Sequence, residues 1–283
     1  MADIEAINGV AAADIEAFNG VAKADIQGSN GCGIPASGAS LWCLVGADGG
    51  VATAAHSDLN DWTGYVSADM GSSDYNAIAY GKDGSGNPLW VSVDSNGNRE
   101  IRYSSDPTDV QGWTDVNPNN PGKLYAVLWG NNVWMAVGQN GSIWRSTDGA
   151  ANWSNIGWFT SGVDVRHLAS DGAGTWMCDN HDQVFKSTDN GATWAEAYDT
   201  ANAPLSDDGY KIRGIAYSTH SGTSRWVVFA VKTGNTRIIY APASDTTSWT
   251  VATLGGGDML AKNLTSTLSR HIAAGAGTVI MCQ

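Results

Sequence analysis

The chain has 283 residues, of which 35 are glycine and only 15% are charged, a composition typical of one sizeable core built from many short strands and tight turns. Its formal net charge of −13 argues against direct binding to DNA or to an anionic membrane surface. Because no apolar run reaches membrane-spanning length, we predict neither a nucleic-acid partner nor membrane insertion.

Residues 1–38 form a predicted N-terminal arm with an internal repeat. Residues 2–10 return eleven residues later as 13–21, and again in a decayed form as 24–31. An eleven-residue period can indicate a right-handed coiled coil, but the Asn-Gly pair in each copy favours an extended or turn-rich arm. A disordered leader is the alternative, and the acidic start is unlike a signal peptide.

The apolar side chains of this arm are too few to bury one another. We therefore expect the arm to dock on another subunit or a neighbouring protein. The side chains expected to make that contact are Ile4, Ile7, Val10, Ile15, Phe18 and Val21.

Residues 39–283 contain a second, longer repeat, in which Ser and Asp precede a Trp. The five copies end at Trp62, Trp113, Trp153, Trp194 and Trp249. A period of roughly 40 to 55 residues with short alternating strands is typical of the blades of a β-propeller. We therefore predict an all-β fold, a β-propeller of four-stranded blades preceded by the arm.

One blade can be laid out from the alternation of apolar and polar residues. Residues 124–128 are its expected innermost strand, 133–137 the second and 142–146 the third, and a strand after Trp153 is the outermost. The same pattern starts again near residues 78, 165 and 212.

The two ends of the propeller complement each other. Residues 41–46 match the pattern of a second strand, but no inner strand precedes them. Residues 270–275 have the pattern of an inner strand, and residues 278–282 have that of a second strand. We therefore expect the C-terminal strand to close the ring against the first blade. Five blades are favoured, with a six-bladed ring containing one incomplete blade as the alternative.

The segment from Ser187 to Trp194 closely resembles the Asp-box, or BNR, motif of sialidases and other β-propellers. In such a turn the Asp accepts backbone hydrogen bonds, Gly permits a positive φ and Trp fills an apolar gap. The resemblance implies a structural role, on the face opposite the ligand site. The residues expected in this role are Ser146, Asp148, Trp153, Ser187, Asp189, Gly191, Trp194, Asp245 and Trp249.

Alignment of the predicted inner strands places Arg166, Arg213 and Arg270 at one equivalent position, which Asn76 and Tyr125 occupy in two other blades. In propellers this position lies near the central channel, opposite the Asp-box turns. Three convergent guanidinium groups can clamp a carboxylate, sulfate or phosphate. The alternative is that the arginines pair with nearby carboxylates, for which Asp164, Asp207 and Asp208 are the candidates.

These arginines invite comparison with the arginine triad of sialidases, but other sialidase features are missing. Such an enzyme also needs a Tyr nucleophile assisted by Glu, and an Asp acid. The propeller contains only Glu100 and Glu196, and residues 33–35 lack the Arg of the Arg-Ile-Pro segment. We therefore predict no catalytic residue and no enzymatic activity.

The cysteines and histidines show no metal-ligand spacing, so we predict neither a metal ion nor a cofactor. Cys43, Cys178 and Cys282 fall at comparable strand positions and are expected to be buried thiols without a disulfide; whether Cys43 and Cys282 are adjacent stays open. His167 and His271 are expected to have packing roles.

The Ile-Asn-Gly-Val cores of the arm resemble repeats in structural proteins of tailed bacteriophages, particularly marine and cyanobacterial phages. Together with an Asp-box propeller, this resemblance implies a virion component, namely a decoration, neck, fibre or tail-associated protein assembled in the host cytoplasm. Its expected partners are other virion proteins, contacted through residues 1–38 in a symmetric assembly of several copies. Host-surface glycans are the candidate ligand of the exposed propeller.

Two other classes of protein share parts of this pattern. One is a sialidase-like glycoside hydrolase or carbohydrate-binding propeller. The other is a cellular assembly factor, because Asp-box propellers also serve as photosystem assembly proteins; that class predicts a targeting or lipobox leader.

Overall fold

The computed structural model describes a nearly continuous central region and parts of both ends. Within residues 6–22 it describes four two-residue strands. The other described ranges are 41–55, 61–67, 69–71, 73–94, 101–116, 122–158, 162–207, 209–220, 223–233, 235–252, 261–266, 271–275 and 278–282. Over these ranges, no helix has the length and apolar character needed to cross a membrane.

Four antiparallel sheets of four strands form the central region. The first contains β8 (Tyr75–Lys82), β9 (Pro88–Asp94), β10 (Ile101–Ser104) and β11 (Thr114–Asp115). The second contains β12 (Leu124–Gly130), β13 (Val133–Gly138), β14 (Ser142–Ser146) and β15 (Ser154–Trp158). The third contains β16 (Leu168–Ser170), β17 (Trp176–Asp179), β18 (Gln183–Ser187) and β19 (Ala195–Asp199). The fourth contains β20 (Lys211–His220), β21 (Thr223–Lys232), β22 (Asn235–Pro242) and β23 (Thr250–Val251).

Two three-stranded sheets flank this region. One contains β5 (Leu41–Val45), β6 (Gly50–Ala55) and β7 (Trp62–Val66), and the other β24 (Ala261–Ser266), β25 (His271–Gly275) and β26 (Thr278–Cys282). In the arm, β1 (Ala6–Ile7) pairs with β2 (Val10–Ala11), and β3 (Ala17–Phe18) pairs with β4 (Val21–Ala22). Both pairs are antiparallel and have the same register, eleven residues apart.

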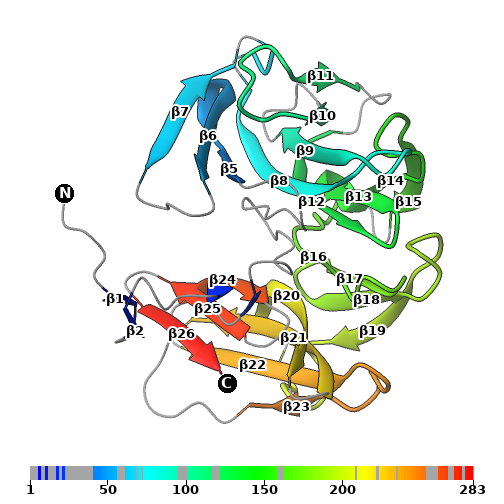
Figure 1. Cartoon of the computed structure of the whole chain (residues 1–283). Helices are drawn as coiled ribbons and strands as arrows, with labels where there is room; N and C mark the ends of the chain where they lie inside the picture. Colours follow the sequence, from blue (N-terminus) through cyan, green and yellow to red (C-terminus); the bar gives the residue numbers. More distant parts are fainter. Residues whose placement is uncertain are drawn as a thin grey trace.

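The sheets follow one another round an arc, from β5–β7 through β12–β15 to β20–β23 (Figure 1). The first strand of each central sheet contacts the first strand of the next, in the order β8, β12, β16 and β20, and β20 contacts β24. The first strand is therefore innermost and the fourth outermost. The predicted all-β class and the predicted strand order within each sheet are confirmed.

The two ends differ in part from the prediction. Short 3-10 turns, η2 (Ala47–Gly49) and η3 (Gln139–Gly141), precede β6 and β14, which makes β5 equivalent to a second strand, as expected. At the other end, β24 packs against β20 and β25 is the middle strand of its sheet. The sequence pattern predicted an inner strand at residues 270–275. In the structure, residues 261–266 form the next strand after β23, and this strand takes the inner position instead. No described pairing joins β26 to β5.

One fully buried tryptophan on each second strand lies between neighbouring sheets. Trp90, Trp134, Trp176 and Trp226 have 0–1% of their surface exposed, and each belongs to the apolar cluster shared with the preceding sheet. Trp134 Nε1 also donates a hydrogen bond of 2.9 Å to Lys82 O of that sheet. Each tryptophan therefore fixes the distance between two sheets by packing.

The connections between third and fourth strands are closed by Ser-Asp turns, here residues 146–153 and 187–194. Ser187 Oγ donates to Asp189 Oδ1 at 2.7 Å and accepts from Gly191 N at 2.9 Å. Asp189 Oδ1 in turn accepts from Thr193 N at 2.9 Å. Hydrogen bonds from the turn lower the pKa of Asp189 below its usual range, so the turn is held by the charged carboxylate.

Ser146 and Asp148 repeat these contacts at 2.8 Å, and Ala150 N donates to Ser146 Oγ at 3.0 Å. Trp153 and Trp194 each donate their ring N–H to a carbonyl of their own turn at 3.1 Å. The side chains of Trp153 and Trp194 pack into the clusters between sheets. The tryptophans of these turns thus enlarge the apolar contact between sheets that the second-strand tryptophans make.

The backbone conformation of Gly191 favours glycine at this position. Its φ is +76°, a conformation that residues with a Cβ rarely adopt. In the fourth sheet, Asp245 Oδ1 accepts from Thr247 N at 2.9 Å, and Trp249 Nε1 donates to Ala197 O of the third sheet at 3.2 Å.

The equivalent turn in the first sheet begins at Ser104. Ser104 pairs with Trp90, as Ser146 pairs with Trp134, so the repeat there starts one residue before Ser105, where the sequence pattern had placed it.

The substitution Ser187→Ala is expected to destabilise the fold. Ser187 is 1% exposed, and its removal leaves the N–H of Gly191 without its hydrogen-bond acceptor, at a cost of about 1–3 kcal/mol in the free energy of unfolding. The exposed Ser154 is the control, and Ser154→Ala should change that free energy by less than about 0.5 kcal/mol. Equal effects of the two substitutions in chemical denaturation would contradict a stabilising role of this turn.

Candidate functional site

The candidate ligand residues lie where the inner strands begin. Asn76, Tyr125 and Arg213 each occupy a register shift at the start of β8, β12 and β20, and Arg166 lies two residues before β16. A bulge leaves its extra residue out of the ladder and redirects the side chain. The structure therefore brings Asn76, Tyr125 and Arg213 to equivalent positions, and Arg166 lies just before its own inner strand. Arg270 lies outside the described residues, and its assignment to an inner strand is wrong, because the strand that follows it, β25, is the middle strand of its sheet.

Arg166 joins two neighbouring inner strands. Its Nη2 lies 2.8 Å from Asp164 Oδ2, and its Cζ lies 4.4 Å from the ring centre of Tyr125. Asn140 N, in the turn before β14, donates to Asp164 Oδ1 at 3.2 Å. The predicted pairing of an arginine with a local carboxylate is thus present at Arg166. Its Nε is buried and has no hydrogen-bond partner in the described part of the chain.

Arg213 is held much less firmly. Its guanidinium makes one long hydrogen bond of 3.4 Å to Ile212 O, and no carboxylate of the described ranges forms an ion pair with it. Asp207, a predicted partner, pairs with Lys232 instead, and Asp208 lies outside the described residues. The charge of Arg213 therefore has no close counter-ion among the described side chains.

Asn76 has a structural contact. Its Nδ2 donates to Leu124 O at 2.9 Å, which ties β8 to the start of β12. The side chain is exposed, so it also borders the region where the inner strands begin.

The sequence did not single out the loop between β17 and β18, which reaches the same region. The buried carboxylate of Asp179 lies 2.7 Å from His167 Nδ1 and accepts from His181 N at 3.0 Å. Ile212 N donates to His181 O at 2.5 Å. The loop is thus fixed at one end by Asp179 and at the other by β20, next to Arg213.

The charges of both arginines act on the His181 ring. Burial lowers the pKa of His181 below its usual 6.5; the Asp179 carboxylate opposes this shift, and the charges of Arg166 and Arg213 lower the pKa further. His181 Nε2 is buried and makes no hydrogen bond within the described residues. The backbone of His181 thus contacts the residue before Arg213, and the charges of both arginines act on its ring, an arrangement suited to an anion.

Residues expected to have no catalytic or metal role occupy unrelated positions. Glu196 is on the outermost strand β19 and accepts from Gln183 Nε2 at 2.7 Å. Cys43 and Cys178 are buried, and burial raises the pKa of the Cys178 thiol well above its usual value. Cys282 has no described side chain. Over the described ranges, no three His, Cys, Asp or Glu side chains are grouped as metal ligands would be.

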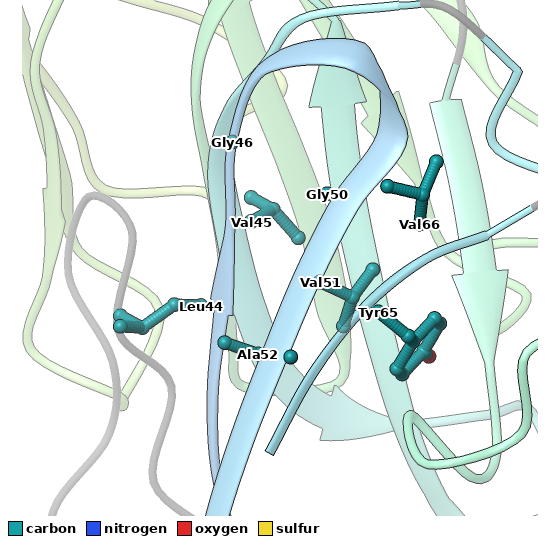
Figure 2. Close-up of a pocket in the computed structure, with 9 residues that line it drawn as sticks. Leu44, Val45, Gly46, Gly50, Val51, Ala52, Tyr65 and Val66 are labelled. Atoms are coloured by element: carbon teal, nitrogen blue, oxygen red, sulfur yellow. The ribbon is translucent and has the colours of Figure 1, made fainter. Parts of the chain in front are cut away.

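A second concave surface lies on the flanking sheet of β5, β6 and β7, where it forms a groove of about 460 Å³. Figure 2 shows the residues that line it. Among them, Leu44 and Val66 are 37% and 68% exposed. Its lining is apolar apart from backbone groups and the Tyr65 hydroxyl, so it has no charged group to bind an ion. The residues of the groove are Leu44, Val45, Gly46, Gly50, Val51, Ala52, Gly64, Tyr65 and Val66.

Sequence comparisons find no relative of this chain: no protein-family model matches it, and no curated protein matches it. Solved structures do match. Virginiamycin B lyase from Staphylococcus aureus has a TM-score of 0.64 at 13% identity, covering 92% of this chain and 81% of the lyase. The structure of YCF48 bound to D1 peptide has a TM-score of 0.57 at 17% identity, covering 86% of this chain and 74% of YCF48.

An ancestral GH74 enzyme is also similar, with a TM-score of 0.61 at 14% identity. The match covers 90% of this chain but only 36% of the enzyme, so this chain spans about a third of its length. All three are β-propeller proteins, and at these identities the likeness concerns the fold alone. The chain is therefore an all-β protein of the β-propeller type.

The substitution Arg166→Gln is expected to raise the pKa of Tyr125. Burial, and then the charge and hydrogen bond of Asp164, already raise this pKa above 10.0, while Arg166 opposes the rise. Removing the cation leaves Asp164 to act alone, so the phenol should ionise at higher pH. An NMR titration of the tyrosine rings measures the shift. Arg225→Gln, which removes the arginine over Tyr240, should leave Tyr125 unchanged; an unshifted Tyr125 in Arg166→Gln would contradict the contact.

Proposed function

We propose that this chain is a non-enzymatic structural protein of a tailed-bacteriophage particle, anchored by residues 1–38. The propeller is displayed on the particle surface and binds an anionic group of a host-surface glycan. The observation that carries the binding role is the pair Arg166 and Arg213, at equivalent positions of adjacent inner strands, with no described carboxylate pairing with Arg213. A guanidinium group in that position is available for a bidentate hydrogen bond to a ligand.

Among the described residues, no acid is paired with a nucleophile, which supports binding over hydrolysis. Glycoside hydrolysis needs two carboxyl groups, or a tyrosine with its base, facing one bond. In the described region Asp164 is engaged by Arg166 and Asn140, and Glu196 lies on an outermost strand. Tyr125 has a raised pKa, which makes it a weaker nucleophile at neutral pH.

The attachment role rests on the repeated arm. Its first two copies contain strand pairs of identical register, flanking Asn8-Gly9 and Asn19-Gly20 in the sequence. A two-stranded pair is barely stable alone, so a repeated array of them gains stability by docking on a partner. A symmetric particle offers such a partner in many copies.

We further propose that the ring has five blades and that a strand of residues 261–283 completes the first one. The inner edge of β5 lacks the inner strand that the four central sheets have, and the sheet exposes the apolar side chains of Leu44 and Val66. An open edge with an apolar face is normally covered in a native protein.

Deleting residues 1–30 is expected to abolish incorporation into particles while leaving the propeller folded, because the arm supplies the anchoring surface. Western blots of purified particles measure incorporation, and circular dichroism of the isolated protein is the folding control. Cryo-electron microscopy of the intact particle should show the arm ordered on a capsid, neck or tail protein and a strand beside β5. Unchanged incorporation of the truncated chain would rule out the anchoring role.

Binding to acidic glycans on an array is expected to fall roughly ten- to hundredfold with Arg166→Gln or Arg213→Gln, the range for loss of a charge-assisted hydrogen bond. Arg225→Gln is the matched control. Arg225 also stacks on a tyrosine, but it lies near the start of β21, at the end of that strand opposite Lys232. Glycan binding that is absent, or that does not depend on either arginine, would refute the binding role.

Two other candidate functions can be distinguished by experiment. Turnover of a fluorogenic sialoside would indicate a sialidase-like enzyme. The similarity to YCF48 solved with a D1 peptide supports a second candidate, an assembly factor that holds a peptide; binding of a peptide in place of acidic glycans would favour it.

A further inference from the structure

The loop of His181 gives the proposed anion site a third group. Arg166 and Arg213 come from the starts of two neighbouring inner strands, and His181 comes from the turn between β17 and β18 of the sheet that begins with β16. Its carbonyl accepts from Ile212 N, the residue before Arg213. The backbone of His181 is thus fixed next to Ile212 and Asp179 by contacts that do not involve its ring.

The imidazole ring of His181 has a nitrogen that no described residue satisfies. His181 has a φ of +78°, which is an uncommon backbone conformation for a residue other than glycine. The Asp179 carboxylate and β20 hold it in this conformation. Its Nε2 is buried and makes no hydrogen bond in the described part of the protein. A buried polar atom without a partner is costly unless a ligand or water satisfies it.

We infer that His181 is the third binding group of this site, beside Arg166 and Arg213, and that the site takes an oxyanion, which it binds most tightly when the imidazole is protonated. This inference rests on the proposed glycan-binding function and identifies the bound group as the carboxylate or sulfate of an acidic sugar. A protonated imidazole donates from Nε2, whereas neutral imidazole donates from only one ring nitrogen.

The direction of the pH effect follows from the groups around the ring. Burial, Arg166 and Arg213 lower the pKa of His181 in the free protein, and Asp179 opposes them. A bound anion would offset the two arginines and raise that pKa. Affinity therefore increases as the pH falls through the pKa of His181. The other charged or titratable groups of the surrounding elements are His167, Asp164, Tyr125, Asp182 and Lys211; Asp182 and Lys211 pair with each other at 2.6 Å.

Inorganic sulfate is the first probe, because its charge is constant between about pH 5 and pH 7.5. Calorimetry on the full chain should show sulfate binding about tenfold tighter at the lower pH, the change expected for one added charge at close range. His181→Asn keeps the backbone contacts and suits a positive φ, and it should reduce this ratio to less than about twofold. His220→Asn, at the other end of β20, is the matched control and should behave as the natural chain.

Sialic acid and galactose 6-sulfate, used as second probes, distinguish a carboxylate from a sulfate ester as the natural group. NMR of the His181 ring provides a readout that needs no substitution, since saturating sulfate should raise its pKa. A pH dependence that persists in His181→Asn, or a ring pKa that sulfate leaves unchanged, overturns the role of His181 alone. Absence of sulfate binding, or binding that survives Arg166→Gln and Arg213→Gln together, overturns the proposed anion site itself.

Discussion

The fold depends on burying both faces of each small sheet against its neighbours. An isolated four-stranded sheet of this size has two apolar faces and cannot cover either one itself. The tryptophan at the start of each second strand supplies the largest part of the contact: Trp134 and Trp176, for example, are fully buried between successive sheets. Because the same side chain recurs at the same register position, every sheet meets the next at a similar distance. Repetition of one contact thus produces a regular arc.

The same constraint separates the two ends of the strands into different roles. The turns between third and fourth strands are filled by their own hydrogen bonds, as at Ser187 and Asp189, and leave few polar atoms for a ligand. At the opposite end, the inner strands begin with bulges, and the bulged residues are not held by the ladder. Arg213 and Tyr125 are placed there because a bulged position tolerates a long or polar side chain that the tightly packed strand interior does not.

The sequence predicted the parts of this structure that repeat. Alternation and the spacing of the tryptophans identified the strands of the second sheet and their order, and alignment of inner strands brought Arg166 and Arg213 to one position. His181 was missed because it belongs to a turn whose equivalents have other residues, and its place depends on a backbone contact to Ile212 that no periodicity encodes. The pairing of Asp207 with Lys232 was missed for a similar reason, since the two residues are 25 positions apart and meet only through the fold.

The net negative charge of the chain bears on the role of Arg166 and Arg213. A protein with a net charge of −13 repels anions at long range, and only a local positive field can hold one. Arg166 is partly neutralised by Asp164, and the Asp179 carboxylate lies near His181, whereas no described carboxylate pairs with Arg213. Selection acting only on stability would pair Arg213 with an acid, and acidic residues are abundant in this chain. An unpaired cation retained in such a chain, next to a buried unsatisfied donor or acceptor, is better explained by a ligand than by packing.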